Sequence, residues 1–238
     1  MSGIGFAGCA TIAFGPPFLM FLFSIAIEPI RIIMLIASAF CWLLSLLISS
    51  LTWYAIVPLR KYIFIGLIYS VIFQELFRFI LYKILRRAEK GLEKVTTAQV
   101  SDSRDVFSYV CGFGFGIMSG VFSMSNVLSE SFGPATMGLK SGNEYFFIVS
   151  AGITLCIIML HTLWGITFFA ALDNKNWFLI TWVVGSHMFV SLITLLNAEE
   201  YHATCIFTLY AMLLINVAVA FNVSNGRVPQ LMDVLMFK

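Results

Sequence analysis

The chain has 238 residues, of which 60% are hydrophobic and only 11% are charged, and its formal net charge is +2. Soluble domains contain roughly 45–50% apolar and about 25% charged residues. The composition therefore excludes a water-soluble globule, a disordered chain, a nucleic-acid-binding protein and a secreted disulfide scaffold. A mean hydropathy of +0.95 indicates a protein that crosses a lipid bilayer several times.

Seven apolar runs predict the transmembrane helices. A helix needs about 20 apolar residues to cross a hydrocarbon core of about 30 Å, and six runs between charged residues are long enough. A seventh run is interrupted by polar residues, which suits a helix that faces protein or water on one side. We predict an all-α polytopic membrane protein with seven transmembrane helices in a single domain, residues 1–238. The spans are residues 4–27, 32–58, 62–85, 106–128, 145–172, 177–197 and 203–223.

The connections and the distribution of Lys and Arg predict the orientation. Residues 86–105 are predicted to form a polar loop, and residues 224–238 a tail. With the first residue outside, ten Lys and Arg residues lie on the inner side and three on the outer side. The positive-inside rule then places the N-terminus in the lumen or outside the cell. It places the polar loop and the C-terminal tail in the cytosol.

Two of the spans contain residues that are unusual in a membrane helix. The first contains Pro16 and Pro17, and because proline lacks an amide donor, we expect this helix to bend or break there. The third contains Glu75 and Arg78, which are three residues apart and can form an intramembrane ion pair. Arg78 is close enough to the cytosolic end to extend its side chain toward water.

The five cysteines give no sign of a metal or redox site. Their number is odd, all lie in apolar runs, and no two are separated by only two residues. This pattern argues against a disulfide framework, a zinc ribbon and a redox pair. We expect five small buried hydrophobic residues, with no metal and no cofactor.

The fourth span contains glycine at every fourth position, namely Gly112, Gly116 and Gly120. A step of four residues advances about 400° around a helix, so these glycines form one stripe, and Gly114 lies on another face. A stripe without side chains lets another backbone approach closely. Two alternatives remain open, packing within this chain's own bundle and packing against another subunit. In both, the glycines are structural.

His161 and His187 each lie 12 residues from the short connection between their two spans. In an antiparallel pair of helices both lie about 18 Å from that connection, so we expect them to meet near the middle of the membrane. Imidazoles there can bind a metal, relay protons or hydrogen-bond to a partner. We favour neutral histidines bonded to backbone or hydroxyl groups between helices, because no carboxylate or cysteine stands at a clear ligand spacing.

The spans contain no residues that favour catalysis. An intramembrane aspartyl protease needs two facing aspartates within the bilayer, whereas all four aspartates lie in predicted loops or the tail. Ser119 and His187 superficially resemble the catalytic pair of a rhomboid-type serine protease. The glycine expected two residues before that serine is Ile117 here. We therefore expect Ser119 to be a packing residue and the chain not to be an enzyme.

Six stretches of the sequence are similar to one known family. They are residues 12–17, 73–78, 109–128, 133–138, 160–165 and 184–187. By these stretches, which reach from the first predicted span to the sixth, the chain resembles the anterior-pharynx-defective family, the seven-span subunit of the gamma-secretase complex. Residues 222–238 depart from the family pattern.

The resemblance implies a non-catalytic scaffold subunit of an intramembrane aspartyl protease whose two aspartates belong to presenilin. It implies assembly with presenilin, nicastrin and presenilin enhancer in a lipid membrane, and support for cleavage of single-span proteins such as Notch and amyloid precursor protein. The implied compartments are the endoplasmic reticulum, Golgi, plasma membrane and endosomes. Gly112, Gly116 and Gly120 match the family's assembly motif, and His161 and His187 match histidines implicated in assembly and activity.

A second hypothesis from the residues alone is a proton- or ion-coupled membrane transporter. Glu75, His161 and His187 are the ionisable groups that such a transporter requires within the membrane. The lack of an internal sequence repeat argues against a transporter built from inverted repeats.

Overall fold

The computed structural model describes residues 3–57, 63–92, 104–132, 145–198 and 201–224. Every regular element within these ranges is a helix, which confirms the predicted all-α class. In chain order the elements are α1 (Gly3–Met20), the π-helix η1 (Phe21–Ile25), α2 (Pro29–Ala55), α3 (Ile63–Leu92), α4 (Arg104–Phe132), α5 (Tyr145–Asp173), α6 (Trp177–Ile193), α7 (Leu195–Ala198) and α8 (His202–Val223).

Six segments in the described part of the chain are long and apolar enough to cross a bilayer, and α6 is a shorter apolar helix. The predicted span 177–197 is not one continuous helix, because α6 ends at Ile193 and α7 follows Thr194. The Thr194 hydroxyl donates to the carbonyl of Ser191 at 2.7 Å. With 17 residues, α6 measures about 25 Å, and α7 adds the length needed for a core of about 30 Å.

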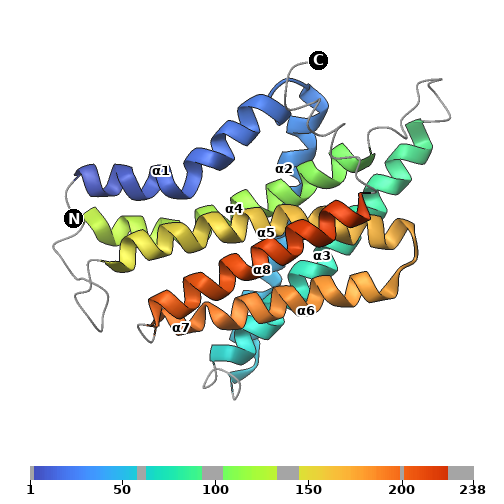
Figure 1. Cartoon of the computed structure of the whole chain (residues 1–238). Helices are drawn as coiled ribbons and strands as arrows, with labels where there is room; N and C mark the ends of the chain where they lie inside the picture. Colours follow the sequence, from blue (N-terminus) through green and yellow to red (C-terminus); the bar gives the residue numbers. More distant parts are fainter. Residues whose placement is uncertain (1–2, 58–62, 93–103, 133–144, 199–200, 225–238) are drawn as a thin grey trace.

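The first helix continues through Pro16 and Pro17, so the break allowed by the sequence does not occur at the prolines. The helix bends without breaking, since Figure 1 shows α1 changing direction along its length. The α-helical hydrogen-bond pattern ends only after Met20, where η1 begins. Within η1, Ser24 donates to the carbonyl of Met20 at 2.5 Å and lies 2.9 Å from the hydroxyl of Tyr109 on α4.

The third helix is longer than the sequence predicted, since α3 continues to Leu92 and α4 begins at Arg104. The predicted loop 86–105 is therefore wrong at both ends. Side-chain pairs explain the extension: Arg86 donates to Glu89 at 3.1 Å one turn later, and Arg104 donates to Glu89 at 2.6 Å. Paired charges let the helix continue beyond its apolar run.

The core of the described bundle is the contact between α4 and α5, which lie side by side in Figure 1. Helix α5 also packs against α1, α6 and α8, while α4 packs against α2. Accordingly α5 is among the most buried spans, with 61% of its most apolar window inside the molecule. The remaining helices expose many large apolar side chains, as lipid-facing helices do.

The glycine stripe of α4 packs against α5 of the same chain. A Cβ atom on Gly112 would lie 2.6 Å from the carbonyl oxygen of Thr162, and one on Gly116 would lie 2.5 Å from that of Ile158. On Gly120 it would lie 2.6 Å from the side chain of Ile158. Of the two alternatives, the structure therefore supports packing within the bundle, because the stripe is already filled by α5.

Two further glycines permit close approach in the same region. A Cβ on Gly165 of α5 would lie 2.5 Å from the Cα of Gly112, so each of these two glycines makes room for the other. Gly114 faces α2 instead, and a Cβ there would overlap the Ser38 hydroxyl. Helix α4 is thus packed closely against α5 on one face and α2 on another. This close packing fixes the position of α5 and of its histidine, His161.

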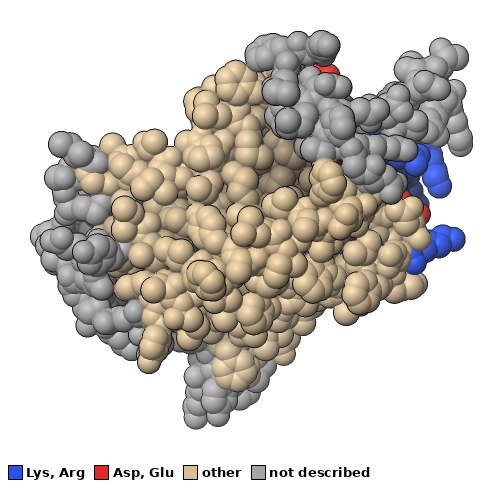
Figure 2. Space-filling view, in the orientation of Figure 1, with Lys and Arg blue, Asp and Glu red and all other residues tan. Residues whose placement is uncertain are grey.

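Charge is concentrated at one end of the described surface. In Figure 2 the described part of the visible face is almost entirely tan, and Lys and Arg atoms gather where α3 and α5 end. An apolar belt with basic residues at one end is the expected surface of a membrane protein. The predicted tail, residues 224–238, lies almost entirely outside the described residues.

Candidate functional site

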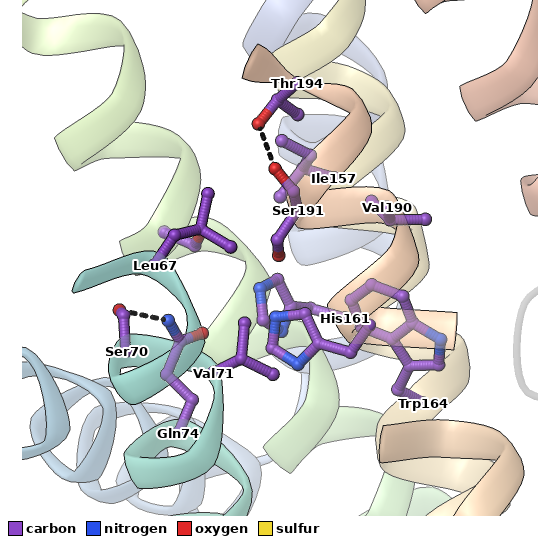
Figure 3. Close-up of a pocket in the computed structure, with 12 residues that line it drawn as sticks. Leu67, Ser70, Val71, Gln74, Ile157, His161, Trp164, Val190, Ser191 and Thr194 are labelled. Carbon is purple, nitrogen blue, oxygen red and sulfur yellow. Dashed lines mark hydrogen bonds between the residues drawn. The ribbon is translucent and has the colours of Figure 1, made fainter. Parts of the chain in front are cut away.

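A pocket of about 140 Å³, lined by both polar and apolar side chains, lies between α3, α5 and α6, with Ser119 of α4 also at its wall. Its residues come from the first half of α3 and the last part of α6, so it lies toward the end of the molecule opposite the basic end. Figure 3 shows His161 between the side chains of α3, such as Val71 and Gln74, and Trp164 of α5. The lining residues are Leu67, Ser70, Val71, Gln74, Ser119, Ile157, His161, Trp164, His187, Val190, Ser191 and Thr194.

A buried ion pair on α3 lies next to this pocket. Arg78 donates through Nη1 to both carboxylate oxygens of Glu75, at 2.7 and 2.9 Å. Their side chains are only 1% and 7% exposed. Removing two charges from water costs several kcal/mol per ion, on the order of the attraction between them, and further hydrogen bonds are needed to offset the cost.

The two histidines supply those further hydrogen bonds, one to each member of the pair. Arg78 Nη2 donates to His161 Nδ1 at 2.9 Å. Because a guanidinium has no acceptor, the proton of His161 must lie on Nε2. His187 Nδ1 lies 2.6 Å from Glu75 Oε1 and donates to that carboxylate. The four side chains thus form one hydrogen-bonded cluster, the Glu75–Arg78–His161–His187 cluster.

Aromatic rings hold the imidazoles in these orientations. Trp164 stacks on His187 with ring centroids 4.4 Å apart and meets His161 edge-on at 5.2 Å. On the other side, the Arg78 guanidinium carbon lies 5.2 Å from the ring centroid of Phe115. Because α3, α4, α5 and α6 all contribute to this packing, a change in any of the four helices alters the cluster.

The predicted meeting of His161 and His187 is confirmed, since their ring centroids lie 4.9 Å apart. The expectation that they bond to backbone or hydroxyl groups is wrong, because their hydrogen-bond partners are the two charged residues of α3. Arg78 does not extend toward water either. A carboxylate one turn away holds it inside the bundle, where water does not compete for the charge.

Sequence reasoning missed three residues of this site, namely Trp42, Gln74 and Trp164. The indole of Trp42 on α2 donates to Gln74 Oε1 at 3.1 Å, and Gln74 in turn donates to the Ser70 hydroxyl at 3.1 Å. The signal for Gln74 was its position beside Glu75 within an apolar run. No local signal marks Trp42 or Trp164, since tryptophan is common in apolar helices.

A second polar group connects α3 to the end of α5, near the surface. Asp173 accepts hydrogen bonds from the Tyr82 hydroxyl at 2.7 Å and from Arg86 Nε at 3.0 Å, and Arg86 Nη2 bonds to its other oxygen. The carboxylate is 29% exposed, in contrast to the nearly inaccessible Glu75. This group fixes the position of α3 relative to α5 at the basic end.

The pocket offers limited chemistry. Ser119 lines it together with His187, as a rhomboid-type pair would require, but within the described part of the chain no hydrogen bond joins the two side chains. In the described part of the chain, no three His, Cys, Asp or Glu side chains gather so as to hold a metal ion. The opposite charges of Glu75 and Arg78 cancel, so the cluster carries no net charge. Its hydrogen bonds and ring contacts are suited to holding α3, α4, α5 and α6 in position.

The sequence comparisons agree with this architecture. The profile of a family described as Aph-1 protein matches residues 4–227. The gamma-secretase subunit Aph-1 of Drosophila melanogaster is 53% identical over 222 residues, covering 93% of each chain. The human gamma-secretase subunit APH-1B is 46% identical over 207 residues, which is 83% of this chain and 80% of the relative. A gamma-secretase subunit APH1-like protein of Arabidopsis thaliana is 31% identical over 209 residues, 82% of this chain and 81% of the relative. Together with its long apolar helices, the match over nearly its whole length identifies this chain as an integral membrane protein that belongs to the Aph-1 family.

Proposed function

We propose that this chain is a non-catalytic structural subunit of a gamma-secretase complex. The observation that carries the proposal is the 53% identity, over 93% of both chains, to a relative named as a gamma-secretase subunit. The proposed partners are presenilin, nicastrin and presenilin enhancer, with presenilin supplying the catalytic aspartates. The clients would be single-span membrane proteins such as Notch and amyloid precursor protein.

The distribution of aspartates supports a role without catalysis. Asp105 lies in the first turn of α4 and Asp173 is the last residue of α5, so both are at helix ends. Asp102 and Asp233 fall outside the described residues. An aspartyl protease needs two carboxyl groups sharing a proton in one site, and the buried carboxylate Glu75 is bonded to Arg78 instead.

The proposed work of the site is mechanical support. The Glu75–Arg78–His161–His187 cluster draws α3, α5 and α6 together, and the stripe of Gly112, Gly116 and Gly120 brings α4 against α5. These contacts would keep the lipid-facing surfaces in the shape that other subunits bind. In this proposal the N-terminus is lumenal or extracellular, and the complex occupies the endoplasmic reticulum, Golgi, plasma membrane and endosomes.

The test is complementation in cells that lack their own Aph-1 subunits. The tagged full chain should co-purify presenilin, nicastrin and presenilin enhancer in mild detergent, and it should restore cleavage of a Notch or amyloid precursor protein reporter. The purified chain alone should leave the reporter intact. Monodisperse, folded chain that recovers none of these partners would contradict the proposal.

A second candidate function, proton- or ion-coupled transport, is favoured by one observation: the pocket reaches both His161 and His187. A transporter made of this chain alone should give a pH-dependent flux in liposomes, and His187→Gln should abolish it. A flux that stays at the level of empty liposomes from about pH 5 to 8, the range in which histidine ordinarily titrates, removes this candidate.

A further inference from the structure

The basic side chains at the end of α3 point in two different directions. Arg86 is directed into the bundle, where it bonds to Asp173 and Glu89. Lys83 and Arg87 are exposed, and neither has a carboxylate partner among the residues that the structure describes. Their separation of four residues places them on one face of the helix, about 5–6 Å apart at Cβ. Two cations with no carboxylate partner in the described ranges therefore lie side by side on the outer surface of a membrane-spanning helix.

Beneath these cations lies an apolar groove. It encloses about 540 Å³ and is lined by Phe79, Ile80, Lys83, Ile84, Arg87 and Ala88. Phe79, Ile80 and Ile84 are 36%, 37% and 55% exposed. The ammonium of Lys83 lies 5.2 Å from the ring centroid of Phe79. Phe79 and Ile80 thus lie one to two turns further into the span than the basic residues, and Ile84 lies between Lys83 and Arg87 along the chain.

This arrangement matches an amphiphile with a negatively charged head. An acyl chain would lie along Phe79, Ile80 and Ile84, and the phosphate would lie between Lys83 and Arg87. Figure 2 shows Lys and Arg gathered at the end of the molecule where α3 ends. If that end faces the cytosol, as the positive-inside rule predicts, it meets the leaflet rich in anionic lipids.

We propose that the outer face of α3, from Phe79 to Ala88, is a binding site for an anionic phospholipid of the cytosolic leaflet. Lys83 and Arg87 recognise the headgroup, and the apolar residues accept an acyl chain. The site is independent of the proposed gamma-secretase role, because it depends only on the spanning helix and its surface.

The test is native mass spectrometry of the full chain in detergent, with phosphatidylserine or phosphatidylcholine added at matched concentrations. Wild-type protein should bind phosphatidylserine more tightly. Lys83→Gln and Arg87→Gln should each weaken phosphatidylserine binding about five-fold, as expected for one basic residue at an anionic membrane surface, and should leave phosphatidylcholine binding unchanged. Lys175→Gln is the matched control, since it removes the same charge from the connection between α5 and α6.

Four outcomes would overturn the proposal. Equal binding of the two lipids by wild-type protein would show that the groove does not distinguish an anionic headgroup from a zwitterionic one. An equal loss in the Lys175→Gln control would show a diffuse surface potential without a site. Glycerophosphoserine has the same headgroup but no acyl chains. If it displaced bound lipid as effectively as phosphatidylserine does, the apolar groove would contribute nothing to lipid binding. Loss of co-purifying subunits in the Lys83 and Arg87 variants, without any change in lipid binding, would identify a protein interface instead.

Discussion

The contact between α4 and α5 gives the sharpest test of how this bundle is held together. A Cβ atom added to Gly116 would lie 2.5 Å from the carbonyl oxygen of Ile158 and 3.1 Å from its Cα, whereas ordinary contact begins at 3.4 Å. The atoms in the way belong to backbone, so no side chain can rotate to relieve the overlap. Gly116→Ala must therefore move α4 away from α5 by about 0.9 Å at this point.

The expected cost follows from that displacement. Overpacking a well-packed interior costs about 1–3 kcal/mol, and we expect the upper part of this range because two helix backbones must separate. Alanine favours the helix over glycine by up to ~1 kcal/mol, which reduces the net loss to about 2 kcal/mol. For a chain of this size such a loss lowers the Tm by about 4–8 °C.

The assay is thermal unfolding of the purified chain in mild detergent, monitored by size-exclusion chromatography. Gly152→Ala is the matched control, because a Cβ on this glycine of α5 would meet its nearest atoms only at 3.9 and 4.0 Å. Its Tm should equal or exceed that of the wild type. If Gly116→Ala unfolds at the wild-type temperature but loses its partner subunits, the stripe is a subunit interface and our reasoning is wrong.

Three further predictions concern the polar groups. Glu75→Gln leaves the buried guanidinium of Arg78 uncompensated and should cost about 3–5 kcal/mol, whereas the double variant with Arg78→Met should recover most of that loss. Thermal unfolding of the full double-mutant cycle measures this coupling, and additive losses would contradict it. Asp173→Asn should cost only about 0–1 kcal/mol in the same assay, because its ion pair with Arg86 is partly exposed to solvent; a loss as large as that of Glu75→Gln would refute this ranking. Ser119→Ala should leave both complex assembly and reporter cleavage unchanged, and abolished cleavage would restore the serine-protease hypothesis.

The length and composition of the sequence were sufficient for the class of the protein. Apolar runs of about 20 residues dictate helices in a bilayer, since every backbone polar group must be satisfied within its own segment. The same local periodicity placed Gly112, Gly116 and Gly120 on one face and Gly114 on another. Equal distances from one tight connection were enough to predict that His161 and His187 meet.

Other features depend on contacts between distant segments, which no local pattern encodes. The end of α3 was misjudged because Arg86 and Glu89 look like loop residues until Asp173 and Arg104 are placed beside them. The spacing of Glu75 and Arg78 did predict their ion pair, but Arg78 was still expected to extend toward water because the sequence does not show that His161 lies beside it.

The sequence by itself determined the membrane class, the helices and the faces on which the glycines lie, because these follow from chain length, hydropathy and helical period. Only the tertiary structure decided that α5 fills the glycine stripe and that each histidine bonds to a different member of the ion pair. The physical reason is that a buried charge needs an opposite charge or hydrogen bonds, and a glycine stripe needs a helix packed against it. Which residues fill these roles depends on which helices the fold brings together.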